Sequence, residues 1–168
     1  MKPEARRGIV LGFAIFVAAV LQLSLASSFR LGGAQPDFLL IVTILGAMFC
    51  DANGGAALGF FAGLCHASLA SPPNGGFGSL IVTRTLVGFG IGWLEERLYR
   101  DNLLNVLLFT AAGTAVAESL YFVVAPLPNI PLWAKTFGFG ILCNCLAAIP
   151  IYLVLRRLVG DTKEFRDY

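Results

Sequence analysis

Four polar side chains stand inside otherwise apolar stretches and could do chemistry there: His66, Arg84, Glu118 and Asn144. An ionisable group in such a stretch is costly to bury, usually faces other segments and should have a partner. If these apolar stretches are helices that cross a membrane, counting 1.5 Å per residue from their outer ends gives the depth of each side chain. Arg84 is about 12 Å deep, Glu118 about 10 Å and His66 about 8 Å. We therefore predict an ion pair between Arg84 and Glu118, with His66 as a neighbour.

Three roles are open for this intramembrane polar cluster. The ion pair could fix the register of the segments, it could bind a proton or a substrate, or it could contact a partner. Asn144 lies midway through the last apolar segment and is the remaining polar member. We expect His66 to be the least important of the four residues.

No catalytic or metal site is apparent. The chain has a single histidine, without a second metal ligand at a workable spacing. No nucleophile has an evident base and orienting group, and the glycines form no phosphate-binding loop. We expect neither catalysis nor a metal, a cofactor or nucleic-acid binding. The cysteines lie in or beside apolar runs, which is typical of buried thiols and not of a disulfide framework: Cys50, Cys65, Cys143 and Cys145.

The composition indicates that lipid is the solvent for most of the chain. Of 168 residues, 57% are hydrophobic and 13% are charged, whereas about 25% of the residues in soluble domains are charged. A chain of this length has too little interior to hide so much apolar surface from water. We therefore expect an all-α membrane protein.

Turn-forming residues divide the sequence into six apolar segments. They form a single integral membrane domain over residues 1–168, and we expect each to be a transmembrane helix: 9–29, 38–50, 55–71, 76–94, 102–125 and 132–155. The second segment is short, about 20 Å as a helix against a hydrocarbon core of about 30 Å. Segments two and three could therefore form a re-entrant hairpin. We favour full crossing because Asp51 and Asn53, between them, require water or headgroups.

Basic residues predict the orientation of the chain. If both termini are cytoplasmic, only Arg30 and Lys135 fall on the outer side. The excess of lysine and arginine on the inner side predicts this topology. The inner basic residues are Lys2, Arg6, Arg7, Arg97, Arg100, Arg156, Arg157, Lys163 and Arg166.

Small residues recur at four-residue spacing on several segments. In lipid, close backbone approach through such residues is a major source of helix association. The pattern predicts either packing within this chain or docking of a partner helix. The residues concerned are Ala14 and Ala18 in the first segment, Gly55, Gly59 and Gly63 in the third, and Gly88 and Gly92 in the fourth.

From Val20 to Arg157 the chain resembles the rod shape-determining protein MreD family. The resemblance rests on the order of "LQLSL", "QPDFLLIV" with Pro36, "GFFAGL", an acidic residue in segment five, and "CNCLAAIPIYLVLRRL" with Pro150. Family members often carry an aspartate about four residues after the second glycine of the third motif. That position is Ala67 here, so a role that depends on this carboxylate cannot be carried over.

The resemblance implies a non-catalytic scaffold in the bacterial inner membrane. Such proteins sit beside the membrane protein MreC and help couple the filament protein MreB to peptidoglycan synthesis by the elongation transglycosylase and transpeptidase. They thereby regulate cell shape. MreD-like chains also resemble the six-helix S components of energy-coupling-factor vitamin transporters. In that alternative, Arg84, Glu118 and His66 would face an outward-open pocket for a small polar ligand.

Overall fold

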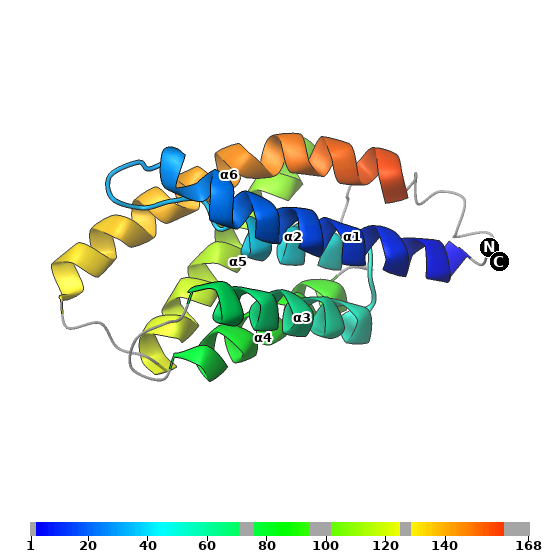
Figure 1. The fold of residues 1–168 in the computed structure, drawn as a ribbon, viewed down its shortest axis with the longest axis horizontal. Helices are drawn as coiled ribbons and strands as arrows, with labels where there is room; N and C mark the ends of the chain where they lie inside the picture. Colours follow the sequence, from blue (N-terminus) through cyan, green and yellow to red (C-terminus); the bar gives the residue numbers. More distant parts are fainter. Residues whose placement is uncertain (1–2, 71–75, 95–101, 125–128, 160–168) are drawn as a thin grey trace.

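The protein is a bundle of six α-helices in the computed structural model, which describes residues 3–70, 76–94, 102–124 and 129–159 (Figure 1). No strand occurs in these ranges. The helices are α1 Pro3–Ser24, α2 Phe38–Ala47, α3 Ala52–Ala70, α4 Phe77–Leu94, α5 Leu103–Val124 and α6 Ile130–Val159, with a short 3-10 helix, η1 Ala26–Ser28, after α1.

The short helix α2 is the centre of the bundle. All ten of its residues are buried, and it contacts each of the other five α-helices. α1 and α6 cover one side of it, and α3 and α4 cover the other (Figure 1). A helix that is apolar all round must be enclosed by other helices or by lipid, and here other helices enclose it.

Glycines bring α3 and α4 into direct backbone contact. A Cβ atom added to Gly59 would lie 2.1 Å from the carbonyl oxygen of Arg84, and one added to Gly55 would lie 2.2 Å from that of Gly88. Gly63 similarly faces the backbone of Ile81, and Gly92 faces that of Asp51. These approaches are possible only without a side chain, so the α3–α4 contact consumes the glycine face of α3.

Four helices are long and apolar enough to cross a membrane: α1, α4, α5 and α6. This finding is compatible with a helical membrane bundle. Among the described residues, the number of helices with the length and composition of a membrane span is four and not six, because α2 has only ten residues. The 19 residues of α3 would be long enough, but α3 is not among the four.

The predicted segments and the observed helices differ most in the first half of the chain. The predicted first segment is 9–29, whereas the observed helix α1 runs from Pro3 to Ser24. The predicted second segment ends at residue 50, whereas α2 ends at Ala47. α1 begins and α6 ends at the same end of the bundle (Figure 1). Five of the basic residues that predict the orientation lie outside the described residues: Lys2, Arg97, Arg100, Lys163 and Arg166.

Candidate functional site

A buried polar cluster surrounds Asp37, the residue directly before α2. Arg84 of α4 donates a hydrogen bond from Nη2 to Oδ2 of Asp37 and forms an ion pair with it. The same Nη2 contacts Nδ1 of His66 on α3, which is 3.4 Å from Oδ1 of Asp37. The three side chains thereby join α2, α3 and α4 at one point.

The prediction that Arg84 pairs with Glu118 is wrong. Arg84 as a whole residue is 3% exposed, and the carboxylate that pairs with its guanidinium is that of Asp37. Breaking a buried ion pair by removing one member typically costs about 3–5 kcal/mol, because the other charge is left uncompensated. The carboxylate of Glu118 makes no hydrogen bond or ion pair with any residue in the described ranges.

His66 is a member of the cluster and not a bystander. A guanidinium can only donate hydrogen bonds, so Nδ1 of His66 accepts from Arg84 in the tautomer that carries its ring proton on Nε2. The ring is 15% exposed at the side-chain level. The expectation that His66 matters least therefore does not fit its contacts.

Side chains from distant helices satisfy the backbone at the start of α2. Asp37 itself caps the helix, with Oδ1 accepting from the backbone N–H of Leu40 at 2.9 Å. The N–H of Asp37 donates to Oδ1 of Asn144 on α6 at 2.8 Å. The N–H of Phe38 donates to Oε1 of Gln22 on α1 at 2.8 Å. The first N–H groups of any helix lack partners within it, and a buried helix start needs such substitutes.

Asn144 extends the cluster to α5, the sixth α-helix that it joins. Its Nδ2 donates to Oγ1 of Thr114 on α5 at 3.1 Å, while its Oδ1 accepts from Asp37. Asn144 is 2% exposed. The amide therefore has a partner at each end and links α5, α6 and the start of α2.

Two members of the cluster, Asp37 and Gln22, were not among the predicted site residues. Both stand in the motifs "QPDFLLIV" and "LQLSL". An aspartate directly before an apolar run is a signal for a helix start, and this signal identifies Asp37. The position of Gln22 depends on how α1 packs against α2, which periodicity does not give.

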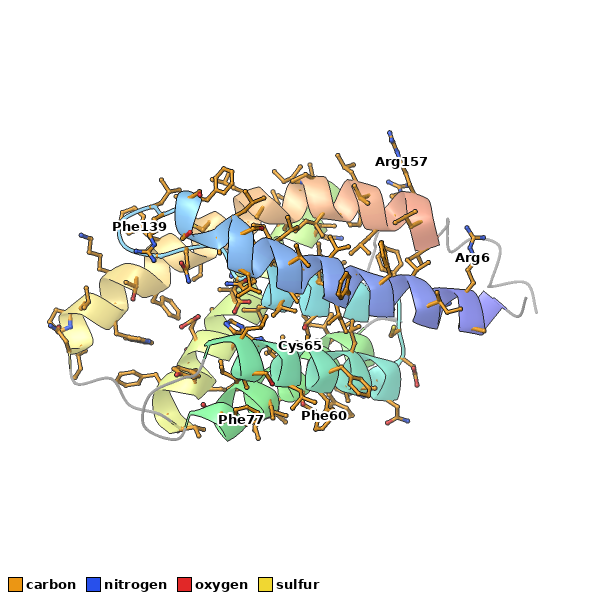
Figure 2. All side chains as sticks on the ribbon, in the orientation of Figure 1. Arg6, Phe60, Cys65, Phe77, Phe139 and Arg157 are labelled. Atoms are coloured by element: carbon orange, nitrogen blue, oxygen red, sulfur yellow. The ribbon has the colours of Figure 1, made fainter. Side chains whose placement is uncertain are left out.

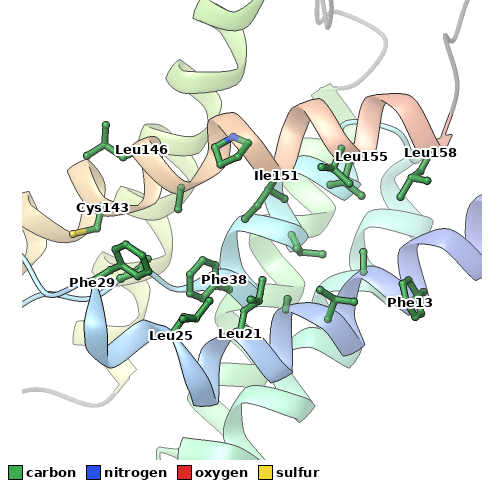
Figure 3. A pocket seen from close by; sticks show the side chains of 18 of the residues that line it. Phe13, Leu21, Leu25, Phe29, Phe38, Cys143, Leu146, Ile151, Leu155 and Leu158 are labelled. Atoms are coloured by element: carbon green, nitrogen blue, oxygen red, sulfur yellow. The ribbon is translucent and has the colours of Figure 1, made fainter.

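A long apolar groove lies between α1 and α6 (Figure 3). Its volume is about 650 Å³. Its lining side chains are apolar and include Phe13, Ala14 and Ala18 of α1, Ala147, Pro150 and Ile151 of α6, the neighbouring Pro36, and Phe38 and Val42 of α2 as the floor. At one end, Arg6 of α1 donates to the carbonyl oxygen of Leu158 on α6 at 3.4 Å.

The structure thus separates the predicted packing residues into two groups. Gly55, Gly59, Gly63, Gly88 and Gly92 face backbone within the chain. Ala14 and Ala18, and also Pro36 and Pro150, line the open groove.

The cluster joins helices to one another. Its ion pair and hydrogen bonds are made within the bundle, and Arg84 is almost fully enclosed. Within the described ranges, no group of three or more His, Cys, Asp or Glu side chains could hold a metal ion. Comparison with known proteins adds no assignment: no family model, curated protein or solved structure matches the chain.

Proposed function

We propose that the protein is a non-catalytic scaffold subunit of the bacterial cell-elongation machinery in the inner membrane. In this role it binds the transmembrane helix of an MreC-like protein and helps to couple an MreB-like filament to peptidoglycan synthesis. The resemblance to the MreD family suggests the machinery. The observation that carries the proposal is the apolar groove between α1 and α6.

The groove has the length expected for contact with a crossing helix. Its lining runs from Val10 to Leu25 on α1 and from Cys143 to Leu158 on α6, which corresponds to about 22 Å on each helix. This length covers most of a hydrocarbon core of about 30 Å. Its volume of about 650 Å³ suits side chains projecting from a helix that lies along the opening.

Small residues on both walls of the groove allow a partner to approach. Ala14 is half-buried on α1 and Ala147 is half-buried on α6. Helix association in lipid depends on van der Waals packing at small residues. A leucine at either position would fill the space that a partner's side chains need.

The proposed topology has both termini in the cytoplasm and six traverses of the bilayer. α3 is about 28 Å long at 1.5 Å per residue, close to the thickness of the hydrocarbon core. The traverse that contains α2 is completed by residues 29–37, which lead from η1 to the polar cluster. Backbone without regular structure is tolerated at membrane depth where protein surrounds it, and Ala34 and Pro36 are the buried residues of this connection.

Two of the three residues proposed for a transporter pocket are engaged elsewhere. Arg84 and His66 contact Asp37, so they do not present free groups to a vitamin-like substrate. This arrangement favours the scaffold over an S component.

Co-purification tests the proposal directly. The protein should retain an MreC-like partner from detergent-solubilised membranes, and Ala14→Leu should lose it while the protein remains folded. Ala112→Leu is the matched control, because Ala112 is exposed on α5 away from the groove. Retention of the partner by Ala14→Leu would remove the groove as the contact surface.

A further inference from the structure

Glu118 is an acidic side chain within an apolar helix, and Arg84 and His66 reach its charge only at longer range, without a direct ion pair. Asp37 takes the one arginine that lies inside α4. Within the described ranges, no cation lies within 4 Å of the Glu118 carboxylate. An ionisable group at such a position indicates a functional site by default, because burial of an unpaired charge is costly.

Glu118 lines a small polar cavity. The cavity is open on one side and has a volume of about 330 Å³, and three parts of the chain line it: the connection that follows η1, α5 and α6. Its polar lining side chains are Arg30, Gln35, Glu118 and Thr136. It shares no lining residue with the groove, although the same connection lines both, with Leu31 and Pro36 in the groove and Arg30 and Gln35 in the cavity.

The connection over this cavity contains an ordered, hydrogen-bonded turn. Leu31 and Ala34 exchange two backbone hydrogen bonds of 2.9 Å, and Gly32 and Gly33 between them have positive φ values of 59° and 95°. A Cβ atom on Gly32 would lie 2.3 Å from the ring of Phe139 on α6, and Figure 2 shows Phe139 beside this connection. The turn is thereby fixed against α6, and Arg30 and Gln35 flank it.

Opposite charges face the same cavity without meeting. Arg30 and Glu118 both line it, yet no ion pair joins them. The hydroxyl of Thr136 donates to backbone carbonyls of its own helix, which leaves its oxygen able to accept. A molecule with an ammonium group for Glu118 and an anionic group for Arg30 would satisfy both charges at once.

We propose that this cavity binds a small zwitterion that carries an ammonium group and a phosphate or carboxylate group. The same chemistry is present in the headgroup of phosphatidylethanolamine and in free phosphoethanolamine. The volume suits a compact group of this kind, because ligand cavities begin at about 300 Å³. The inference does not depend on the scaffold role, since the groove and the cavity are separate.

Binding to the full-length protein in detergent can be measured by thermal shift and by isothermal titration. We expect phosphoethanolamine to raise the melting temperature, whereas ethanolamine alone and inorganic phosphate alone should have little effect. Native mass spectrometry with phosphatidylethanolamine and with phosphatidylglycerol tests the lipid source. Retention of the former lipid without a response to free phosphoethanolamine assigns the site to a headgroup, and a response to both assigns it to the shared chemistry.

Variants decide whether this cavity is the site. Glu118→Gln and Arg30→Gln should each weaken binding at least about tenfold, since each removes one charge-assisted contact. Lys135→Gln is the matched control, because Lys135 is an exposed cation on α6 that does not line the cavity. Because Arg30 is exposed, Arg30→Gln should fold normally. It therefore still tests the cavity if Glu118→Gln unfolds.

Three results would overturn the proposal, and the first two concern recognition of the anionic group. The first is unchanged binding in Arg30→Gln. The second is an equal response to ethanolamine and phosphoethanolamine, which would mean that the anionic group is not recognised. The third is the absence of any response to the zwitterion and to both lipids.

Discussion

The α3–α4 contact and the α1–α6 face use similar small residues with opposite results. Between α3 and α4, glycine at four-residue spacing allows backbone to touch backbone, with Gly55 and Gly88 facing each other. Between α1 and α6, Ala14 and Ala147 line an open groove of about 650 Å³. Figure 3 shows that side chains of α2 form the floor of this groove.

The difference teaches that a small-residue pattern indicates close approach without saying what approaches. α3 and α4 follow one another in the chain and can pack directly. α1 and α6 both rest on α2, through residues such as Leu11 and Leu155 of the common core. The helix between them holds the two apart, so their alanines remain available to a partner.

The largest effect is expected from a side chain in the closed contact. Gly59→Leu would place atoms where the carbonyl oxygen of Arg84 lies, 2.1 Å from the added Cβ, and should cost more than about 3 kcal/mol. Size-exclusion chromatography in detergent should show loss of the folded species. Gly90→Leu is the control, since a Cβ there has nothing within 4 Å. Equal stability of the two variants would contradict the backbone contact.

The next effect comes from the ion pair that joins α2 to α4. Asp37→Asn keeps an oxygen for the cap and removes the charge, and Arg84→Gln removes the opposite charge. Each should lower the free energy of unfolding by about 3–5 kcal/mol.

A double-mutant cycle separates pairing from other losses. The double variant should cost clearly less than the sum of the two single variants, because neither charge then remains alone. Additive costs would mean that the two side chains do not act as a pair.

A smaller effect is expected from His66→Ala. The change removes the acceptor that α3 offers to Arg84 and should cost about 1–3 kcal/mol. Ser68→Ala is the control on the same helix, because Ser68 is exposed and bonds only to Leu64 of its own helix. Thermal unfolding of the two variants compares them, and identical melting temperatures would return His66 to a passive role.

The smallest effect on stability is expected in the open groove. Ala14→Leu should change the free energy of unfolding by less than about 0.5 kcal/mol, because the added methyl groups enter unfilled space. The same thermal measurement checks this value. A loss as large as that of Gly59→Leu would show that the α1–α6 face is as closed as the α3–α4 contact.

The sequence predicts the helices better than it predicts their pairing. The runs 76–94 and 102–125 correspond to α4 and α5 within one residue at each end, because length and apolar composition determine them. The crossing of all six segments stays a prediction. Counting residues along the helices predicts Glu118 as the partner of Arg84, because the two residues lie at similar depths in their segments.

The actual partner of Arg84 could not be found by counting along apolar segments. Asp37 stands at the edge of such a segment, and its position depends on a connection that enters the bundle before α2 begins. Arg84, His66 and Asn144 do meet in one cluster, but the point where they meet is set by the start of α2. That arrangement follows from three-dimensional packing and not from local periodicity.

The hydrogen bond between Asp37 and Asn144 has a consequence for biogenesis. The two residues are 107 positions apart, so α6 must be synthesised before the N–H of Asp37 receives its partner. Until then, in a bilayer, α2 would carry unsatisfied polar groups into a medium without water. A ribosome-bound chain that ends before Asn144 should therefore keep the end of α2 accessible to water-soluble thiol reagents at Cys50, three residues after the helix, and release of the finished chain should protect this thiol.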